Sequence, residues 1–179
     1  MGANYKRPSS RKVTPAQCGE LQDRNVAVAR VAKVVKGGRR FSFSVLVVTG
    51  DGEGNVGYGL GKANEVPVAV KKASDQARAQ VVSVPLVGST IPFEVTGTSG
   101  AAKIILKPAS PGTGVIAGGA ARALLEAAGV KDILTKAMGS RNPHNLLAAV
   151  MDGLMKLENP EEVASRRGKT LQQLEYKLF

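Results

Sequence analysis

Five consecutive residues, Lys36-Gly37-Gly38-Arg39-Arg40, combine two properties that help a protein to hold phosphate groups. Glycines let the backbone approach another polymer closely, and the three cations lie in a stretch with no acidic residue between Asp23 and Asp51. An exposed turn that is kept soluble by its charges would have the same composition. The rest of the chain must therefore decide between a phosphate-binding site and a plain turn.

Two other glycine-rich motifs imitate nucleotide-binding loops, but their surroundings do not fit. Residues 52–57 form a GxGxxG pattern, yet the next predicted helix begins only near Asn64, after another strand. Gly61-Lys62-Ala63 resembles the end of a P-loop, but Ala63 replaces the Ser or Thr that would bind magnesium. Neither motif predicts a nucleotide site.

A third glycine motif, residues 112–117, lies between a predicted strand and a predicted helix and is followed by Asp132. It matches GxGxxA, but the residues 108–111 make the connection too long and stiff for a dinucleotide turn. A glycine loop at a helix start can still offer amides to an anion or a flat surface to a partner protein. A third interpretation is that the Gly118-Gly119 pair only allows tight helix packing.

The residue types that support catalysis are scarce. His144 and Cys18 are the only histidine and cysteine, and no two carboxylates have an acid–base spacing. The counts exclude a metal site of clustered His and Cys. We predict a protein that is not an enzyme and has no cofactor, metal or small-molecule substrate.

The charge predicts a polyanionic partner. The chain of 179 residues has a net charge of +11, and residues 21–86 alone carry ten Lys and Arg against five Asp and Glu. With no Trp, three Tyr and four Phe, few rings could stack on bases, which favours folded RNA recognised by backbone and shape.

We expect no membrane partner, because no apolar run reaches about 18 residues. Without a secretion signal, cytoplasmic residence is expected.

The first half has the pattern of three strands and a helix. Residues 1–20 form a basic tail, expected to be flexible. Alternating apolar residues predict two strands joined at the Gly37-Gly38 bend, a third strand, and a helix with Asn64 as its N-cap. Their expected ranges are 26–35, 41–49, 56–60 and 64–82. This is the layout of a double-stranded-RNA-binding-like domain over residues 21–86.

The second half, residues 87–159, predicts another α+β unit after a break at residues 84–88. Asn142 and Pro143 predict a helix start. The other expected elements are strands at 91–96, 103–106 and 133–138 and a helix at 117–128. Residues 160–179 predict a short helix and a basic tail. The predicted fold class is therefore α+β with two units.

The chain also resembles a known family, that of the bacterial small-subunit ribosomal protein numbered five. The resemblance extends over about residues 19–168 and is carried by the glycine–arginine segment and by several stretches: 46–67, 107–110, 112–120, 129–134, 139–140, 142–143 and 152–154. It implies a structural protein that binds small-subunit ribosomal RNA where the subunit body meets its head. Residues 35–41 would reach toward the connecting RNA helix.

The resemblance further implies protein partners. Gly112, Gly114 and Arg122 would lie against the small-subunit protein numbered four and contribute to decoding accuracy. The second unit would contact the protein numbered eight. The resemblance also implies cations near messenger RNA where it enters the ribosome, with Arg24, Lys62 and Lys71 as candidates.

Three residues depart from the family pattern. Pro111 stands where the family usually has Glu, His144 replaces a common Ile, and Ala148 replaces a common Arg. The last puts in doubt any polar contact made there. Two other classes of function stay open. A free RNA chaperone or regulator would not explain why the second half of the chain also resembles the ribosomal family. A nucleotide-dependent enzyme would need a phosphate loop, which this chain lacks.

Overall fold

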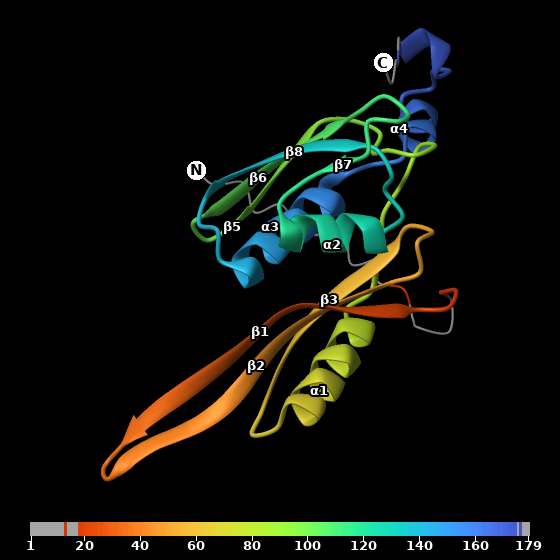
Figure 1. Cartoon of the computed structure of the whole chain (residues 1–179). Helices are drawn as coiled ribbons and strands as arrows, with labels where there is room; N and C mark the ends of the chain where they lie inside the picture. The colour runs from red at the N-terminus through yellow and green to blue at the C-terminus, as the bar shows by residue number, and fades with distance from the viewer. Residues whose placement is uncertain (1–12, 14–17, 175, 177–179) are drawn as a thin grey trace.

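The chain folds into two sheets of mostly antiparallel strands, with helices between the two sheets and one helix on the far side of the first sheet (Figure 1). The structure, a computed structural model, describes residue 13, residues 18–174 and residue 176. Most of the basic tail predicted at residues 1–20 therefore lies outside the described residues. The predicted α+β class, with a strand–strand–strand–helix unit followed by a second α+β unit, is confirmed.

The first sheet has the order β1-β2-β3-β4, and the second has the order β5-β6-β8-β7. All neighbouring strands are antiparallel except β7 and β8. The elements are β1 (Gln22–Val35), β2 (Gly38–Gly50), β3 (Asn55–Ala63), α1 (Val66–Ala79), β4 (Val82–Ser83), β5 (Val95–Ser99), β6 (Ala102–Pro108), β7 (Val115–Ile116), α2 (Gly119–Ala127), β8 (Ile133–Gly139), α3 (Pro143–Lys156), α4 (Pro160–Arg166) and a 3-10 turn (Gln172–Leu174).

The second half of β2, from residue 45 onward, is buried on both faces, which explains the continuous apolar run of residues 45–48. Val45 and Val47 pack with Ala69 and Ala73 of α1. The alternate residues of the run instead join the large core formed with α2, α3 and the second sheet. The layers are thus second sheet, α2 with α3, first sheet, and α1 (Figure 1). One continuous core joins the two units.

Glycine occupies three successive β3 positions that face α1, Gly57, Gly59 and Gly61. A Cβ at any of these positions would lie between 2.0 and 2.4 Å from a carbonyl oxygen of the helix. No real Cβ contact is that short, and backbone atoms cannot move aside cheaply. The three glycines therefore let α1 lie directly on the strand.

The first hairpin turns one residue earlier than predicted. Gly38 pairs with Val35 and begins β2, so the two-residue turn is Lys36-Gly37. Gly37 has a φ of 90°, a left-handed conformation that glycine adopts without strain.

α1 also differs from its prediction at both ends. Its N-cap is Glu65, with no side-chain hydrogen bond, and not Asn64. Pro67 lies in the first turn, as expected. The helix ends at Ala79 because Val82 pairs with Val56 of β3 as part of β4, a strand that the sequence did not predict.

In the second unit, the strand predicted at residues 91–96 is wrong for most of its length. β5 begins only at Val95, and Ile91 is fully buried outside any strand. Pro92 has no N–H to donate to a ladder, which explains why pairing starts later. The predicted start of α3 is confirmed, because the Asn142 side chain accepts a hydrogen bond from the His144 N–H at 3.1 Å. No helix in the described part of the chain is long and apolar enough to cross a membrane.

Candidate nucleic-acid interface

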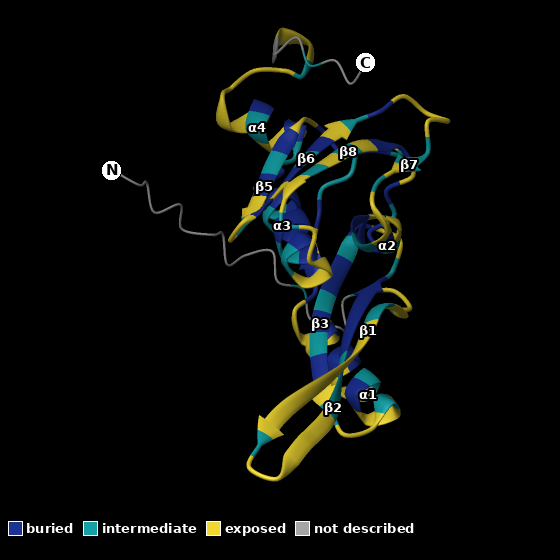
Figure 2. Ribbon diagram, turned by 60° about the vertical axis from the view of Figure 1, so that its left-hand side comes forward, coloured by how far each residue is buried: buried dark blue, intermediate teal, exposed yellow. Residues whose placement is uncertain are grey.

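The hairpin of β1 and β2 projects from the body of the protein (Figures 1 and 2). β3 ends opposite Phe43, so beyond this residue the hairpin continues as a two-stranded ribbon. Residues 28–34 and 36–41 are exposed. A two-stranded ribbon is at best marginally stable in water by itself. Its length and exposure therefore indicate a surface that binds another molecule.

The ribbon carries positive charge on both faces. Lys33 lies directly opposite Arg40, and Val34 lies opposite Arg39. Because side chains alternate along a strand, Arg39 and Arg40 lie on opposite faces. No acidic residue occurs between Asp23 and Asp51. The predicted set Lys36, Gly37, Gly38, Arg39 and Arg40 is exposed as one group at the end of the ribbon.

Lys33 was missed as a site residue. It lies within the apolar alternation of β1 and did not stand out as part of a basic cluster. Counting back from the observed turn Lys36-Gly37 places it opposite Arg40, whereas the predicted bend at Gly37-Gly38 would have placed it opposite Ser42.

The three other cations predicted to bind RNA lie in different places. Arg24 of β1 forms an ion pair with Glu126 of α2, so its charge is already partly offset. Lys62 is exposed on β3 opposite Ser44, near the base of the ribbon. Lys71 is exposed on α1. Gly61 faces α1, so the neighbouring Lys62 points to the other side of the sheet, and one flat surface cannot include both lysines.

The glycine loop before α2 encloses a carboxylate of the same chain. Asp132 is buried, and its Oδ1 accepts hydrogen bonds from the backbone N–H groups of Gly112 at 3.0 Å and Gly114 at 2.9 Å. A hydrogen bond from the Ser89 side chain, followed by those from the Gly114, Gly112 and Thr113 amides, lowers the pKa of Asp132. The amides that could hold an external anion are therefore already occupied.

The alternative that Gly118 and Gly119 serve tight packing is wrong. A Cβ at either position would meet no atom within 4 Å. Gly112 and Gly114 instead have φ values of 90° and 78°, so their role is conformational.

Arg122 is exposed on α2 and donates a hydrogen bond from its guanidinium to the Val115 carbonyl at 3.0 Å. This contact places Arg122 beside the loop that contains Gly112 and Gly114, so the three predicted partner-binding residues belong to one region of the surface. Arg122 also lines a shallow depression together with Gly129 and Lys131. The region is open enough for another protein to contact it.

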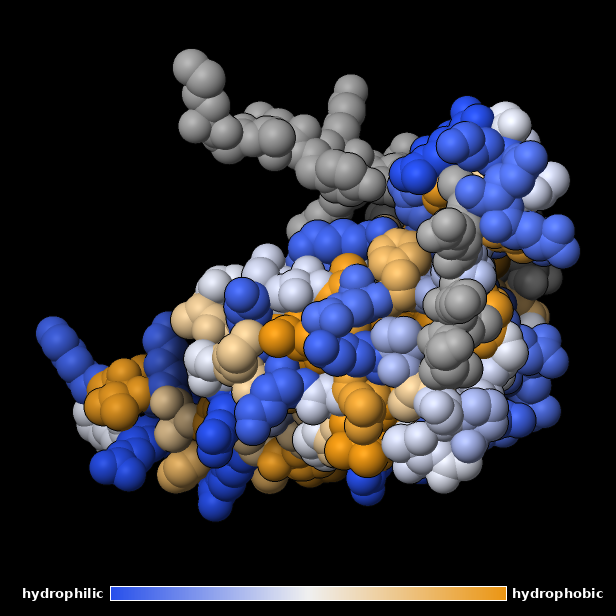
Figure 3. All heavy atoms as spheres, turned by 90° about the horizontal axis from the view of Figure 1, so that it is seen from above, coloured by the Kyte–Doolittle hydropathy of each residue, from blue (hydrophilic) through white to orange (hydrophobic). Residues whose placement is uncertain are grey.

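The outer face of the second sheet is a further exposed region, because α2 and α3 pack on its inner face. Viewed from above, the molecule shows hydrophobic and hydrophilic side chains interleaved on this side (Figure 3). The alternation along β6 and β8 sets lysines beside apolar side chains: Lys103, Ile105 and Lys107 on β6, and Leu134, Lys136 and Met138 on β8. Exposed apolar residues between lysines are suited to a protein partner.

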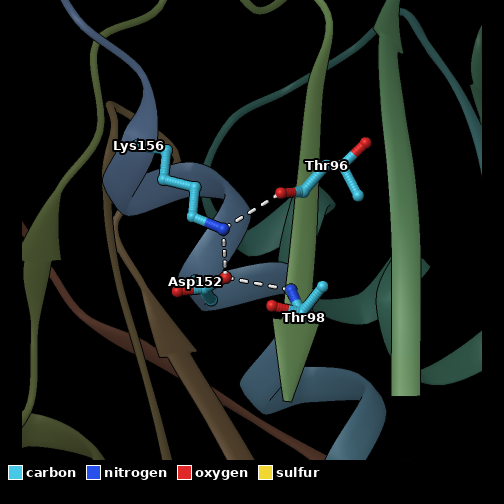
Figure 4. Close-up of polar contacts among 4 residues, drawn as sticks. All are labelled: Thr96, Thr98, Asp152 and Lys156. Atoms are coloured by element: carbon cyan, nitrogen blue, oxygen red, sulfur yellow. Dashed lines mark hydrogen bonds and ion pairs between the residues drawn. The ribbon is translucent and has the colours of Figure 1, made fainter. Parts of the chain in front are cut away.

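The pair Asp152 and Lys156 holds α3 against the free edge of β5 (Figure 4). Asp152 accepts from the Thr98 N–H at 2.9 Å and from Lys156 Nζ at 2.6 Å, and Lys156 also donates to the Thr96 carbonyl at 3.1 Å. These contacts satisfy backbone groups that an edge strand would otherwise expose. The pair thus has a structural role. Among the described residues, no group of three or more His, Cys, Asp or Glu side chains could hold a metal ion.

Comparison with known proteins gives matches over both units. The family model described as "Ribosomal protein S5, N-terminal domain" matches residues 21–85, and "Ribosomal protein S5, C-terminal domain" matches residues 97–167. The chain is 59% identical over 155 residues to "Small ribosomal subunit protein uS5" of Syntrophobacter fumaroxidans, covering 87% of this chain and 93% of the relative. The proteins of the same name from Lawsonia intracellularis and Halorhodospira halophila are 59% and 53% identical, covering 82% and 86% of this chain and 90% and 92% of the relatives.

Proposed function

Because the chain belongs to the ribosomal protein S5 family, we propose that its hairpin binds ribosomal RNA where the body of the small subunit meets its head. We further propose that it supports decoding accuracy together with a neighbouring ribosomal protein. Family members are structural components of the small ribosomal subunit, not enzymes, and bind its RNA.

One observation carries the RNA contact, namely the exposed ribbon that ends in residues 36–40. It has cations on both faces and no acidic residue, and a ribbon of two strands lacks a core of its own. A groove in folded RNA would supply phosphates on both sides of such a ribbon, and basic side chains with an accessible backbone suit recognition by shape.

The glycine loop is proposed as the contact with the small-subunit protein numbered four. Asp132 occupies the amides of Gly112 and Gly114, which argues against a phosphate there and leaves the outside of the loop for a protein. Arg122, exposed beside the loop, can pair with a carboxylate of that partner. A modest interface of this kind could rearrange during decoding.

The second unit is proposed to contact the protein numbered eight. The mixed lysine and apolar surface on β6 and β8 supports a protein neighbour for this unit. As the cation that lies near messenger RNA, Lys62 is a better candidate than Arg24, because Glu126 offsets the charge of Arg24. Lys71 stays a candidate on the other side of the sheet. The protein would act within the ribosome, in the cytoplasm.

A shortened hairpin tests the RNA contact. Replacing residues 33–40 by Asn-Gly joins the paired residues Ala32 and Phe41 through a two-residue turn and leaves the packed part of the sheet intact. We expect this variant to fold, as judged by circular dichroism, but to be depleted from the small-subunit peak of a lysate gradient relative to the full-length protein. Equal sedimentation of both proteins with the subunit would contradict the proposal, and sedimentation of the full-length protein away from ribosomes would favour a free RNA chaperone.

A further inference from the structure

One face of the ribbon combines a ring, small side chains and cations. Ala32 lies opposite Phe41, and Val34 lies opposite Arg39. Arg30 is two residues before Ala32 on the same strand, so the alternation of side chains puts all five residues on the same face. We name this set, Arg30, Ala32, Val34, Arg39 and Phe41, the ring face.

Phe41 is 48% exposed although it is one of only four phenylalanines. Its neighbour on the same strand face, Phe43, packs instead beside the core formed with α1. The guanidinium carbon of Arg30 lies 3.9 Å from the centroid of the Phe41 ring, a cation–π contact. This contact holds the ring in place and covers one side of it.

The space beside the ring is left open by small residues. Ala32, directly opposite Phe41, has only a methyl group, and Val34, the diagonal neighbour toward the turn, is 74% exposed. Arg39 stands next to Val34 at the end of this space. A flat apolar molecule could therefore lie against the ring with a cation at its edge.

The chemistry of this space matches a nucleotide. A base stacks on an aromatic ring or a guanidinium plane through its apolar surface, while its phosphate pairs with a cation. No carboxylate occurs between residues 24 and 50 to repel the phosphate. The opposite face of the ribbon has Lys33, Arg40 and Ser42 but no ring, and so suits phosphates alone.

We propose that the ring face is a stacking site for one unpaired base of RNA, with Phe41 and Arg30 as its platform and Arg39 as the contact to the phosphate. This inference rests on the proposed RNA-binding function of the hairpin and adds a base contact to it. Stacking is tolerant of base identity, since every base has an apolar face. The site therefore anchors an unstacked nucleotide without reading its sequence.

The test compares salt dependence among variants of the full chain. The probe is the particle assembled from small-subunit ribosomal RNA and all small-subunit proteins except this one. Phe41→Leu removes the ring but no charge, so the Kd should rise roughly five- to a hundred-fold with an unchanged slope of log Kd against log salt. Arg39→Ser should reduce the slope, because one phosphate contact is lost. Phe41→Trp keeps a stacking ring and should restore the affinity.

Each outcome has one meaning. Wild-type affinity for Phe41→Leu, or a failure of Phe41→Trp to restore the loss, would overturn the stacking site while leaving the hairpin contact intact. If the wild-type chain did not bind the particle, the proposed function itself would fail. Because Phe41 is half exposed, we expect all three variants to keep the wild-type melting temperature.

Discussion

The carboxylate of Asp132 accepts a hydrogen bond from the backbone N–H of Gly114 at 2.9 Å, so the glycine loop holds a negative charge that belongs to its own chain. The same oxygen accepts from Gly112 at 3.0 Å. A loop that resembles an anion-binding motif in sequence is therefore an internal brace between the segment that precedes β7 and the start of β8. It shapes the surface beside Arg122.

This brace predicts a dependence of stability on pH. Hydrogen bonds to the ionised form lower the folded-state pKa of Asp132, so its contribution is complete above the ordinary aspartate pKa of about 3.9 and is lost as pH falls through the lower folded value. Asp132→Asn should lower the melting temperature at pH 7 and flatten its decline in acid. The measurement is thermal unfolding from neutral to acid pH. Asp75→Asn, at an exposed position on α1, is the control. Parallel curves for wild type and Asp132→Asn would show that the brace is absent.

The packing of α1 on β3 predicts a large cost for one methyl group. A Cβ at Gly61 would lie 2.0 Å from the carbonyl oxygen of Ala69, so Gly61→Ala must push the helix away from the sheet. We expect a loss of roughly 1–3 kcal/mol or more in the free energy of unfolding, measured with urea. Gly118→Ala is the matched control, because a Cβ there meets nothing within 4 Å. If both variants were equally stable, the close approach would be disproved.

Substitutions at the end of the ribbon should weaken RNA binding without lowering the stability of the fold. Arg39→Ser with Arg40→Ser removes two exposed cations that support no core contact, so the melting temperature should stay within a degree or two of wild type. Binding to structured small-subunit RNA should weaken. The slope of log Kd against log salt should decrease by the amount expected for the loss of about two phosphate contacts. The control, Lys103→Ser with Lys136→Ser, removes the same charge from the second sheet. Equal losses of affinity in both pairs would mean that only net charge matters.

Arg122 predicts an effect on accuracy without an effect on RNA binding. Arg122→Leu deletes an exposed cation on α2 and its hydrogen bond to Val115, and leaves the buried face of the helix untouched. We expect raised misreading in a reporter assay, with normal subunit assembly and unchanged RNA affinity of the isolated protein. Normal accuracy together with weakened RNA binding would move Arg122 from the protein contact to the RNA contact.

Local chemistry made much of the fold predictable. The α+β class and the absence of enzymatic function are confirmed, and α3 starts where Asn142 and Pro143 predict. The strand predicted at residues 91–96 failed because burial of Ile91 comes from tertiary packing and Pro92 blocks pairing. The second buried face of β2 could not be foreseen either, since it is covered by helices that follow much later in the chain.

The candidate site was predictable where it depends on neighbours in sequence. The cluster at residues 36–40 is visible in the sequence and is exposed as one group. The contact of Asp132 with Gly112 was not predicted, although both residues had been noted together, because the motif was weighed only as a dinucleotide turn, an external anion site or a protein contact. The ring face was missed because Arg30 meets Phe41 only through the register of two strands.

The position of the ribbon in the subunit tests the central claim most directly. Cys18 is the only cysteine, so Cys18→Ser combined with Ser42→Cys places a single thiol on the ribbon with little change in side-chain volume. An iron chelate attached to this thiol cleaves nearby RNA in assembled small subunits, and a matched protein with Ser99→Cys carries the chelate on the second unit. We predict cleavage from position 42, but not from position 99, in the RNA helix that joins the body to the head. Cleavage from position 42 confined to other parts of the RNA would contradict the account.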